Sequence, residues 1–281
     1  MKKTKINFLL VFLLLSVFLY NSCVSLAKKT ESAYSYLADS MDFYCSIPVQ
    51  SNMKFIDYLL DSVSSKIATD VPIKSYLKKV FFGGYFSSQK STANFQSVLV
   101  ATIPNFVFSR VFSEKNGWTS HSVKNEIFFE NAQGLQVKNK KGIGVFVSNG
   151  MIEAMDTSHT VSGLLDDFFL TSKNSFSFMI GNPVSFFSTF FTKNITFPID
   201  TITGYLVDNS FKQDGNLETV ACSLRIVIEN QKYTKALMSL LRLLFTHNFS
   251  SITAENNTIV ISDIVISLKS IDDFLQQNFN F

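Results

Sequence analysis

Residues 1–22 of this 281-residue chain differ in pattern from the rest and determine where the folded domain can begin. They begin with Lys2, Lys3 and Lys5 and continue with an apolar run from Ile6 to Leu19. This run is shorter than the about 20 residues that a membrane-spanning helix needs, so it is typical of an export signal. The domain therefore forms from the remaining residues, which are enough for one large or two small domains.

Cys23 follows Ser22 at the end of this segment and resembles the acylated cysteine of the bacterial lipoprotein signal. In that signal the cysteine takes a lipid group, with palmitate-type chains, and becomes the new N-terminus. The resemblance implies a chain that is lipid-anchored to a bacterial cell membrane and faces the periplasm or the cell exterior. Tyr20 and Asn21 depart from the usual Leu-Ala-Gly/Ser-Cys pattern, as relaxed spirochaete signals do. The alternative is a secreted soluble protein cleaved after Ala27.

The charge of the mature chain argues against nucleic acid as a partner. The whole chain carries 25 Lys and Arg against 22 Asp and Glu, but three of the lysines lie in the signal. The mature chain from Cys23 therefore has 22 residues of each sign and no net charge. Nucleic-acid binding needs a basic field. The expected partner is membrane lipid, which the chain contacts through acylated Cys23. An apolar ligand is a further candidate.

The order of apolar patterns predicts an α+β fold with two tandem units. A tether is expected over residues 23–33, a first unit over 34–172 and a second over 173–281. We expect two ferredoxin-like repeats, with mostly antiparallel sheet and amphipathic helices on one face. Three short matches in the same order support an internal repeat. They pair Gly84-Tyr85-Phe86 with Gly204-Tyr205-Leu206, Val147-Ser148-Asn149 with Ile261-Ser262-Asp263, and Leu165–Phe169 with Ile271–Leu275.

Two local patterns carry further expectations. Pro72 predicts a short helix that continues through Lys79. The Asn149-Gly150 pair predicts a hairpin turn between strands over 145–148 and 151–155.

No group of residues predicts catalysis, a metal or a cofactor. His121, His159 and His247 lack partners at metal-ligand or catalytic spacing. We therefore expect no enzyme. For Cys45 and Cys222 the sequence allows two alternatives: they form a disulfide in an oxidising compartment, or they are two buried thiols.

Two predicted helices, 183–191 and 231–245, have more apolar surface than packing on one sheet requires. Along 231–245 the apolar residues cover an arc of about 220°, against the roughly 100° or more that a surface helix needs. With lengths of about 13 and 22 Å they are too short to cross a bilayer core of roughly 30 Å upright. The candidate membrane- or lipid-contact residues are Phe186, Phe187, Phe190, Phe191, Leu237, Leu241, Leu244 and Phe245.

The signal, the length and these helices together resemble the concealed outer-membrane-associated lipoproteins of Treponema. In that family a lipid-anchored domain lies on the periplasmic leaflet and inserts amphipathic helices into it. The resemblance implies a non-enzymatic envelope lipoprotein whose helices contact membrane or hold a lipid-like ligand. The alternative from the residues alone is a structural or protein-interaction lipoprotein with all helices in the core.

Overall fold

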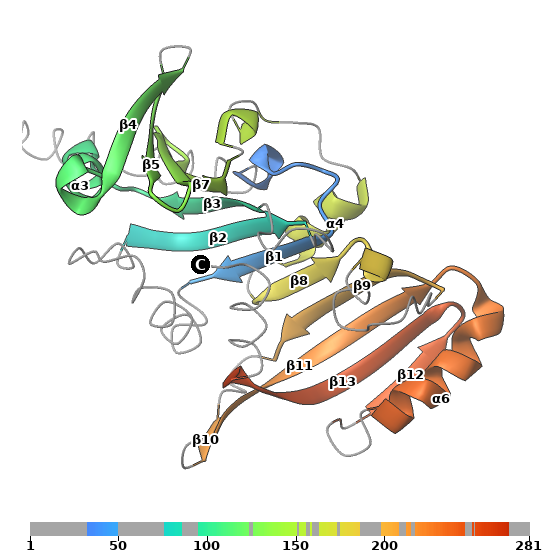
Figure 1. The fold of residues 1–281 in the computed structure, drawn as a ribbon. Helices are drawn as coiled ribbons and strands as arrows, with labels where there is room; N and C mark the ends of the chain where they lie inside the picture. Colours follow the sequence, from blue (N-terminus) through green and yellow to red (C-terminus); the bar gives the residue numbers. More distant parts are fainter. Residues whose placement is uncertain are drawn as a thin grey trace, which may run out of the picture.

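One antiparallel sheet forms the frame of the molecule (Figure 1). The structure is a computed structural model that describes residues 33–49, 76–85, 95–123, 126–150, 152–155, 158, 163–172, 175–185, 198–207, 212–214, 217–244, 249 and 251–269. The strands in this part of the chain are β1 (Phe43–Pro48), β2 (Leu77–Gly84), β3 (Phe95–Ala101), β4 (Trp118–Val123), β5 (Glu126–Asn131), β6 (Leu135–Lys140), β7 (Gly144–Asn149), β8 (Ser177–Ile180), β9 (Ile199–Leu206), β10 (Lys212–Asp214), β11 (Leu217–Ile228), β12 (Ser251–Glu255) and β13 (Thr258–Ser267).

Short helices are added to this sheet. The α-helices are α3 (Asn105–Val111), α4 (Gly163–Thr171) and α6 (Thr234–Leu244). The 3₁₀ helices are η1 (Ala33–Tyr36), η3 (Glu114–Asn116), η4 (Ile152–Met155) and η5 (Gln231–Tyr233).

The two halves of the chain share this single sheet. The strand order is β12-β13-β11-β9-β8-β1-β2-β3-β7-β6-β5-β4, and β10 pairs with β11. The halves meet where β1 pairs with β8, from Phe43 opposite Ile180 to Ser46 opposite Ser177. A mostly antiparallel α+β fold is therefore confirmed. The ferredoxin-like arrangement is not confirmed. Its split βαβ units place another strand between two strands that follow each other in the chain, whereas β1, β2 and β3 here lie side by side, as β8 and β9 do.

Helices lie on both faces of the sheet, and the expectation of one covered face was wrong. Neighbouring residues of a strand point to opposite faces. Met179 belongs to the same cluster as Leu165 of α4, whereas Ile180 belongs to the cluster of Leu237 of α6. We call these faces the α4 face, which η1 and η4 also cover, and the α6 face. Helix α3 lies on the α6 face, because Leu99 packs against both its cluster and that of α6.

The reason for two covered faces lies in the central strands. Phe43, Tyr44 and Cys45 are apolar at consecutive positions, and Tyr44 and Cys45 are both buried. A strand with an unbroken apolar run is buried on both faces. Alternation of apolar and polar residues, which marks a strand covered on one side, is absent from this part of β1.

Two local expectations were wrong. Leu77–Lys79, expected at the end of a helix, begins strand β2. Residues 152–155 form η4 instead of the second strand of a hairpin, although Gly150 has the positive φ of a turn residue, 74°. Ile152 and Met155 are 2% and 0% exposed. Their burial on the sheet replaces the strand pairing that Asn149-Gly150 predicted.

The two halves pair their strands in the same order. β1, β2 and β3 are consecutive neighbours in the first half, as β8, β9 and β11 are in the second. Gly84 lies opposite Phe43 and Phe95, and Gly204 lies opposite Phe178 and Leu224. The matched residues Gly84 and Gly204 thus occupy equivalent places in the sheet. The internal repeat itself stays a prediction.

Candidate membrane-contact surface

Helix α6 starts from a capped turn. The Asn230 side chain accepts a hydrogen bond of 3.1 Å from the Lys232 N–H, as an N-cap residue does. The Thr234 hydroxyl donates to the Asn256 carbonyl at 3.1 Å, which joins the start of α6 to the turn between β12 and β13. The helix predicted over 231–245 is therefore present over the described residues 231–244, as η5 followed by α6.

The inner side of α6 is part of the core. Leu237 and Leu241 are 6% and 8% exposed and belong to one cluster with Ile226, Ile259 and Ile261 of β11 and β13. Both leucines were expected to contact membrane or lipid. In this structure they fasten the helix to the α6 face of the sheet, because they occupy the side of α6 that faces it.

The outer side of α6 carries a line of exposed apolar side chains. Tyr233, Leu240 and Leu243 are 41%, 36% and 71% exposed, and Ala236 is exposed as well. Their spacing of three, four and three residues places them on one side of the helix. We call these four residues the α6 stripe. The 220° apolar arc contained them, but the sequence did not separate its buried members from its exposed ones.

Basic side chains border the α6 stripe. Lys232, Lys235 and Arg242 are all exposed, and residues 231–244 contain no Asp or Glu. The Lys232 ammonium lies 4.7 Å from the centre of the Tyr233 ring, a cation–π distance. The outer surface of α6 is therefore apolar along one line and positively charged beside it.

The other predicted contact residues cannot be placed. Phe186, Phe187, Phe190, Phe191 and Phe245 lie outside the described residues, and the structure does not describe the Leu244 side chain. The described beginning of the 183–191 segment includes Val184, which is 45% exposed.

The first described residues after the expected tether are docked on the α4 face. Ala33 and Tyr34 are 0% and 6% exposed. The Tyr34 hydroxyl donates to Asp166 of α4, and its ring stacks on Phe169 with 4.7 Å between the centroids. The described chain thus begins on the α4 face, which is opposite α6. The tether was expected to include residue 33, but Ala33 already belongs to η1.

The alternative of two buried thiols is confirmed. Cys45 and Cys222 are free and 6% and 0% exposed. They lie on strands β1 and β11, which β8 and β9 separate. Burial raises the pKa of each thiol to about 12. Protonated thiols of this kind behave as apolar core groups.

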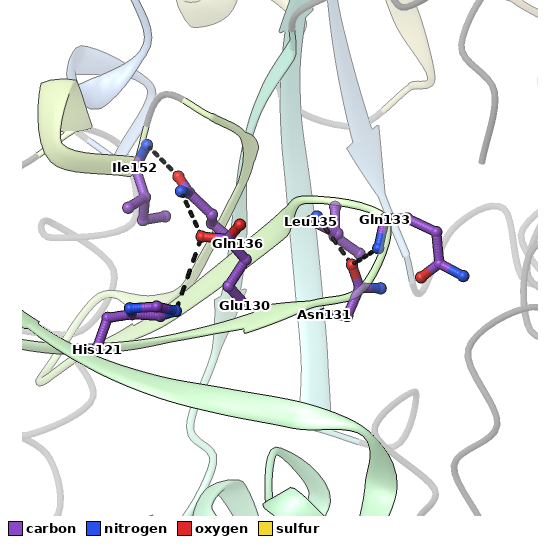
Figure 2. Close-up of polar contacts among 7 residues, drawn as sticks. All are labelled: His121, Glu130, Asn131, Gln133, Leu135, Gln136 and Ile152. Atoms are coloured by element: carbon purple, nitrogen blue, oxygen red, sulfur yellow. Dashed lines mark hydrogen bonds and ion pairs between the residues drawn. The ribbon is translucent and has the colours of Figure 1, made fainter.

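A group of polar contacts joins several described elements of the first half. Figure 2 shows a chain in which the Ile152 N–H donates to the Gln136 Oε1 at 3.2 Å and the Gln136 Nε2 donates to the Glu130 Oε2 at 3.0 Å. His121 Nε2 lies 4.0 Å from the same Glu130 oxygen. Asn131 Oδ1 accepts the N–H of Gln133, in the turn after β5, at 3.0 Å and the N–H of Leu135, the first residue of β6, at 2.9 Å. These contacts tie β4, β5, β6 and η4 together.

The described part of the chain offers neither a metal site nor a spanning helix. No three His, Cys, Asp or Glu side chains of the described residues are grouped as metal ligands. None of the described helices has the length and apolar character needed to span a bilayer. The class that these features define is an α+β protein with one long antiparallel sheet, an N-terminal lipoprotein-type signal and an exposed apolar helix surface.

Comparison with known proteins identifies the family. A family model described as outer membrane-associated lipoprotein TP0453 matches residues 28–272, so the chain belongs to this family. Membership confirms the resemblance that the signal and the helices indicated, and it supports a lipid-anchored localisation at a membrane. No curated protein matches the sequence significantly.

Solved structures show the same fold. Crystal forms I, III and IV of TP0453 match with TM-scores of 0.62, 0.61 and 0.60 at 16%, 16% and 15% sequence identity. The matches cover 87%, 85% and 86% of this chain and 96%, 95% and 95% of the TP0453 chains.

Proposed function

We propose that this protein is a non-enzymatic envelope lipoprotein that acylated Cys23 anchors and that touches the membrane surface with the α6 stripe. The observation that carries the proposal is the exposure of Leu243, at 71%, in line with Tyr233, Ala236 and Leu240. A helix with one apolar side and basic residues beside it is the pattern of helices that lie in the membrane interface. The family's description as outer membrane-associated supports a membrane as the partner.

The anchor and the α6 stripe have different roles in this proposal. Two or three acyl chains on Cys23 hold a protein stably on a bilayer, so the stripe is not needed for attachment. Its role in this proposal is to orient the domain, because contact through α6 turns the α6 face of the sheet toward the lipid. Phe186, Phe187, Phe190 and Phe191 remain candidates for a second contact.

The second candidate function is a protein-interaction lipoprotein. The burial of Leu237 and Leu241 favours it, because half of the predicted lipid surface of α6 is core. In that case the α6 stripe contacts a protein and does not bind vesicles.

Vesicle flotation tests the proposal. The mature chain with Cys23→Ser has no acyl group, so any flotation reports on the folded domain. We expect this variant to float and Leu243→Ser to reduce its flotation severalfold. Leu164→Ser is the matched control, since Leu164 is a 56% exposed leucine of α4 on the other face.

Flotation with and without the acyl group also separates the two candidates. If Cys23→Ser abolishes flotation completely, the α6 stripe has no affinity for lipid and the protein-interaction function is favoured. If Leu164→Ser and Leu243→Ser reduce flotation equally, the contact does not lie on α6.

A further inference from the structure

We propose that the α6 stripe selects an anionic bilayer, and that it docks there while α6 stays packed on the sheet. The inference rests on the membrane contact proposed above and adds the lipid class and the mode of binding. The partner is a lipid surface with phosphate head groups and excess negative charge.

The positive charge beside the α6 stripe favours an anionic lipid. The mature chain has no net charge, yet η5 and α6 hold Lys232, Lys235 and Arg242 and no acid. Lys235 and Arg242 are seven residues apart, which is two helical turns, so they lie on one strip of the helix. A positive strip beside an apolar line matches lipid phosphates beside acyl chains.

Two acidic residues lie near the start of α6. Glu229 directly precedes the Asn230 cap, and Glu255 precedes Asn256, whose carbonyl accepts the Thr234 hydroxyl. Both are therefore near the start of α6. Arg242 and Leu243 lie at the other end, which we expect to approach the anionic surface first.

The packing of α6 indicates that the helix binds lipid without leaving the sheet. Leu237 and Leu241 are buried in the sheet cluster, whereas Leu240 and Leu243 already face outward. The outer side alone offers apolar and basic contacts to lipid. Binding through it leaves the two buried leucines in place and needs no opening of the core.

Vesicle composition tests the lipid class. The mature chain carrying Cys23→Ser is titrated with phosphatidylcholine vesicles that contain or lack phosphatidylglycerol, at low and high salt. We expect binding to strengthen with phosphatidylglycerol and to weaken with salt. Lys235→Gln and Arg242→Gln should each weaken binding to the anionic vesicles about fivefold, the equivalent of about 1 kcal/mol per charge.

Arg225→Gln is the matched control for these charge changes. Arg225 is exposed on β11, next to Leu224 and Ile226 of the α6 cluster, so it points to the α4 face. We expect it to change binding less than twofold. Since Lys235, Arg242 and Arg225 are all exposed, circular dichroism should show the same folded spectrum for each variant.

Thiol labelling tests the mode of binding. Leu243→Cys and Leu241→Cys are compared in the Cys23→Ser chain, where buried Cys45 and Cys222 stay unreactive. Vesicles should protect position 243 and leave position 241 unlabelled. Labelling of position 241 only when vesicles are present would show that α6 leaves the sheet, which overturns the proposed mode.

The outcomes separate this inference from the proposed function. Equal binding to both vesicle types, with no effect of Lys235→Gln or Arg242→Gln, overturns the lipid class and leaves membrane contact standing. The absence of binding to both vesicle types overturns the membrane contact and the inference together.

Discussion

Gly204 occupies a place in the sheet where a side chain does not fit. A Cβ atom there would lie 2.8 Å from Leu224 Cδ2 and closer still to the Phe178 ring. We expect Gly204→Ala to lower the free energy of unfolding by roughly 1–3 kcal/mol, the usual cost of overpacking. Urea denaturation measures the change.

Gly163→Ala is the control for this substitution. A Cβ at Gly163, the first residue of α4, meets no atom within 4 Å. We expect a change of less than about 0.5 kcal/mol there. A similar loss in both variants would show that the effect does not come from the Phe178 contact.

The buried thiols give a second prediction at the residue scale. The pKa of Cys45 and Cys222 is raised to about 12, so a thiol reagent at pH 8 should label neither until the protein unfolds. Each folded-state pKa lies above the about 8.5 of a free cysteine. The thiol contribution to stability is thus complete below about pH 8.5 and decreases as the pH rises toward the folded-state pKa. Rapid labelling of either cysteine in the native chain would contradict this burial.

At the scale of helices and strands, some elements could be predicted from local sequence patterns and others could not. The helix predicted over 231–245 is confirmed over the described residues 231–244, because its cap and its apolar spacing are local signals. The strand at Leu77–Lys79 was missed, because its pairing with β1 and β3 involves residues distant in the chain. Asn256 and Asn257 form the two-residue turn between β12 and β13, where Asn256 has a positive φ of 53°, a conformation that asparagine tolerates.

The two sides of α6 should respond differently to truncation. Leu241→Ala removes a buried side chain and should lower the free energy of unfolding by about 2–4 kcal/mol. Leu243→Ala removes an exposed one and should change it by less than about 0.5 kcal/mol. Thermal denaturation of both variants measures the difference. Equal destabilisation would mean that Leu243 is also part of the core.

At the scale of the whole molecule the sequence predicted an α+β chain with two similar halves, but not how the halves meet. The pairing of β1 with β8 is long-range, and nothing in the local pattern of either strand specifies its partner. The same limit applies to the candidate surface. The spacing of apolar residues predicted excess apolar surface on helices 183–191 and 231–245, but the packing on the sheet decides which apolar residues of α6 stay exposed.

The shared sheet predicts that the halves depend on each other. Expressed alone, residues 173–281 would expose the edge of β8 that pairs with β1, and residues 34–172 would expose β1. We expect each fragment to aggregate alone, because an uncovered edge strand pairs with other chains. Co-expressed fragments should purify together as a folded pair. A stable, folded monomer of 173–281 would show that its sheet does not need β1.

The docking of Tyr34 on α4 has a mechanical consequence. If Cys23 anchors the protein as proposed, any pull from the membrane reaches the described domain at Ala33, and the Tyr34 contacts with Asp166 and Phe169 pass this load to the α4 face. Beyond them the load enters β1, which lies between β2 and β8 in the middle of the sheet. Tension along a central strand strains its hydrogen bonds together in shear, so the pairing of β1 with both β2 and β8 opposes the force.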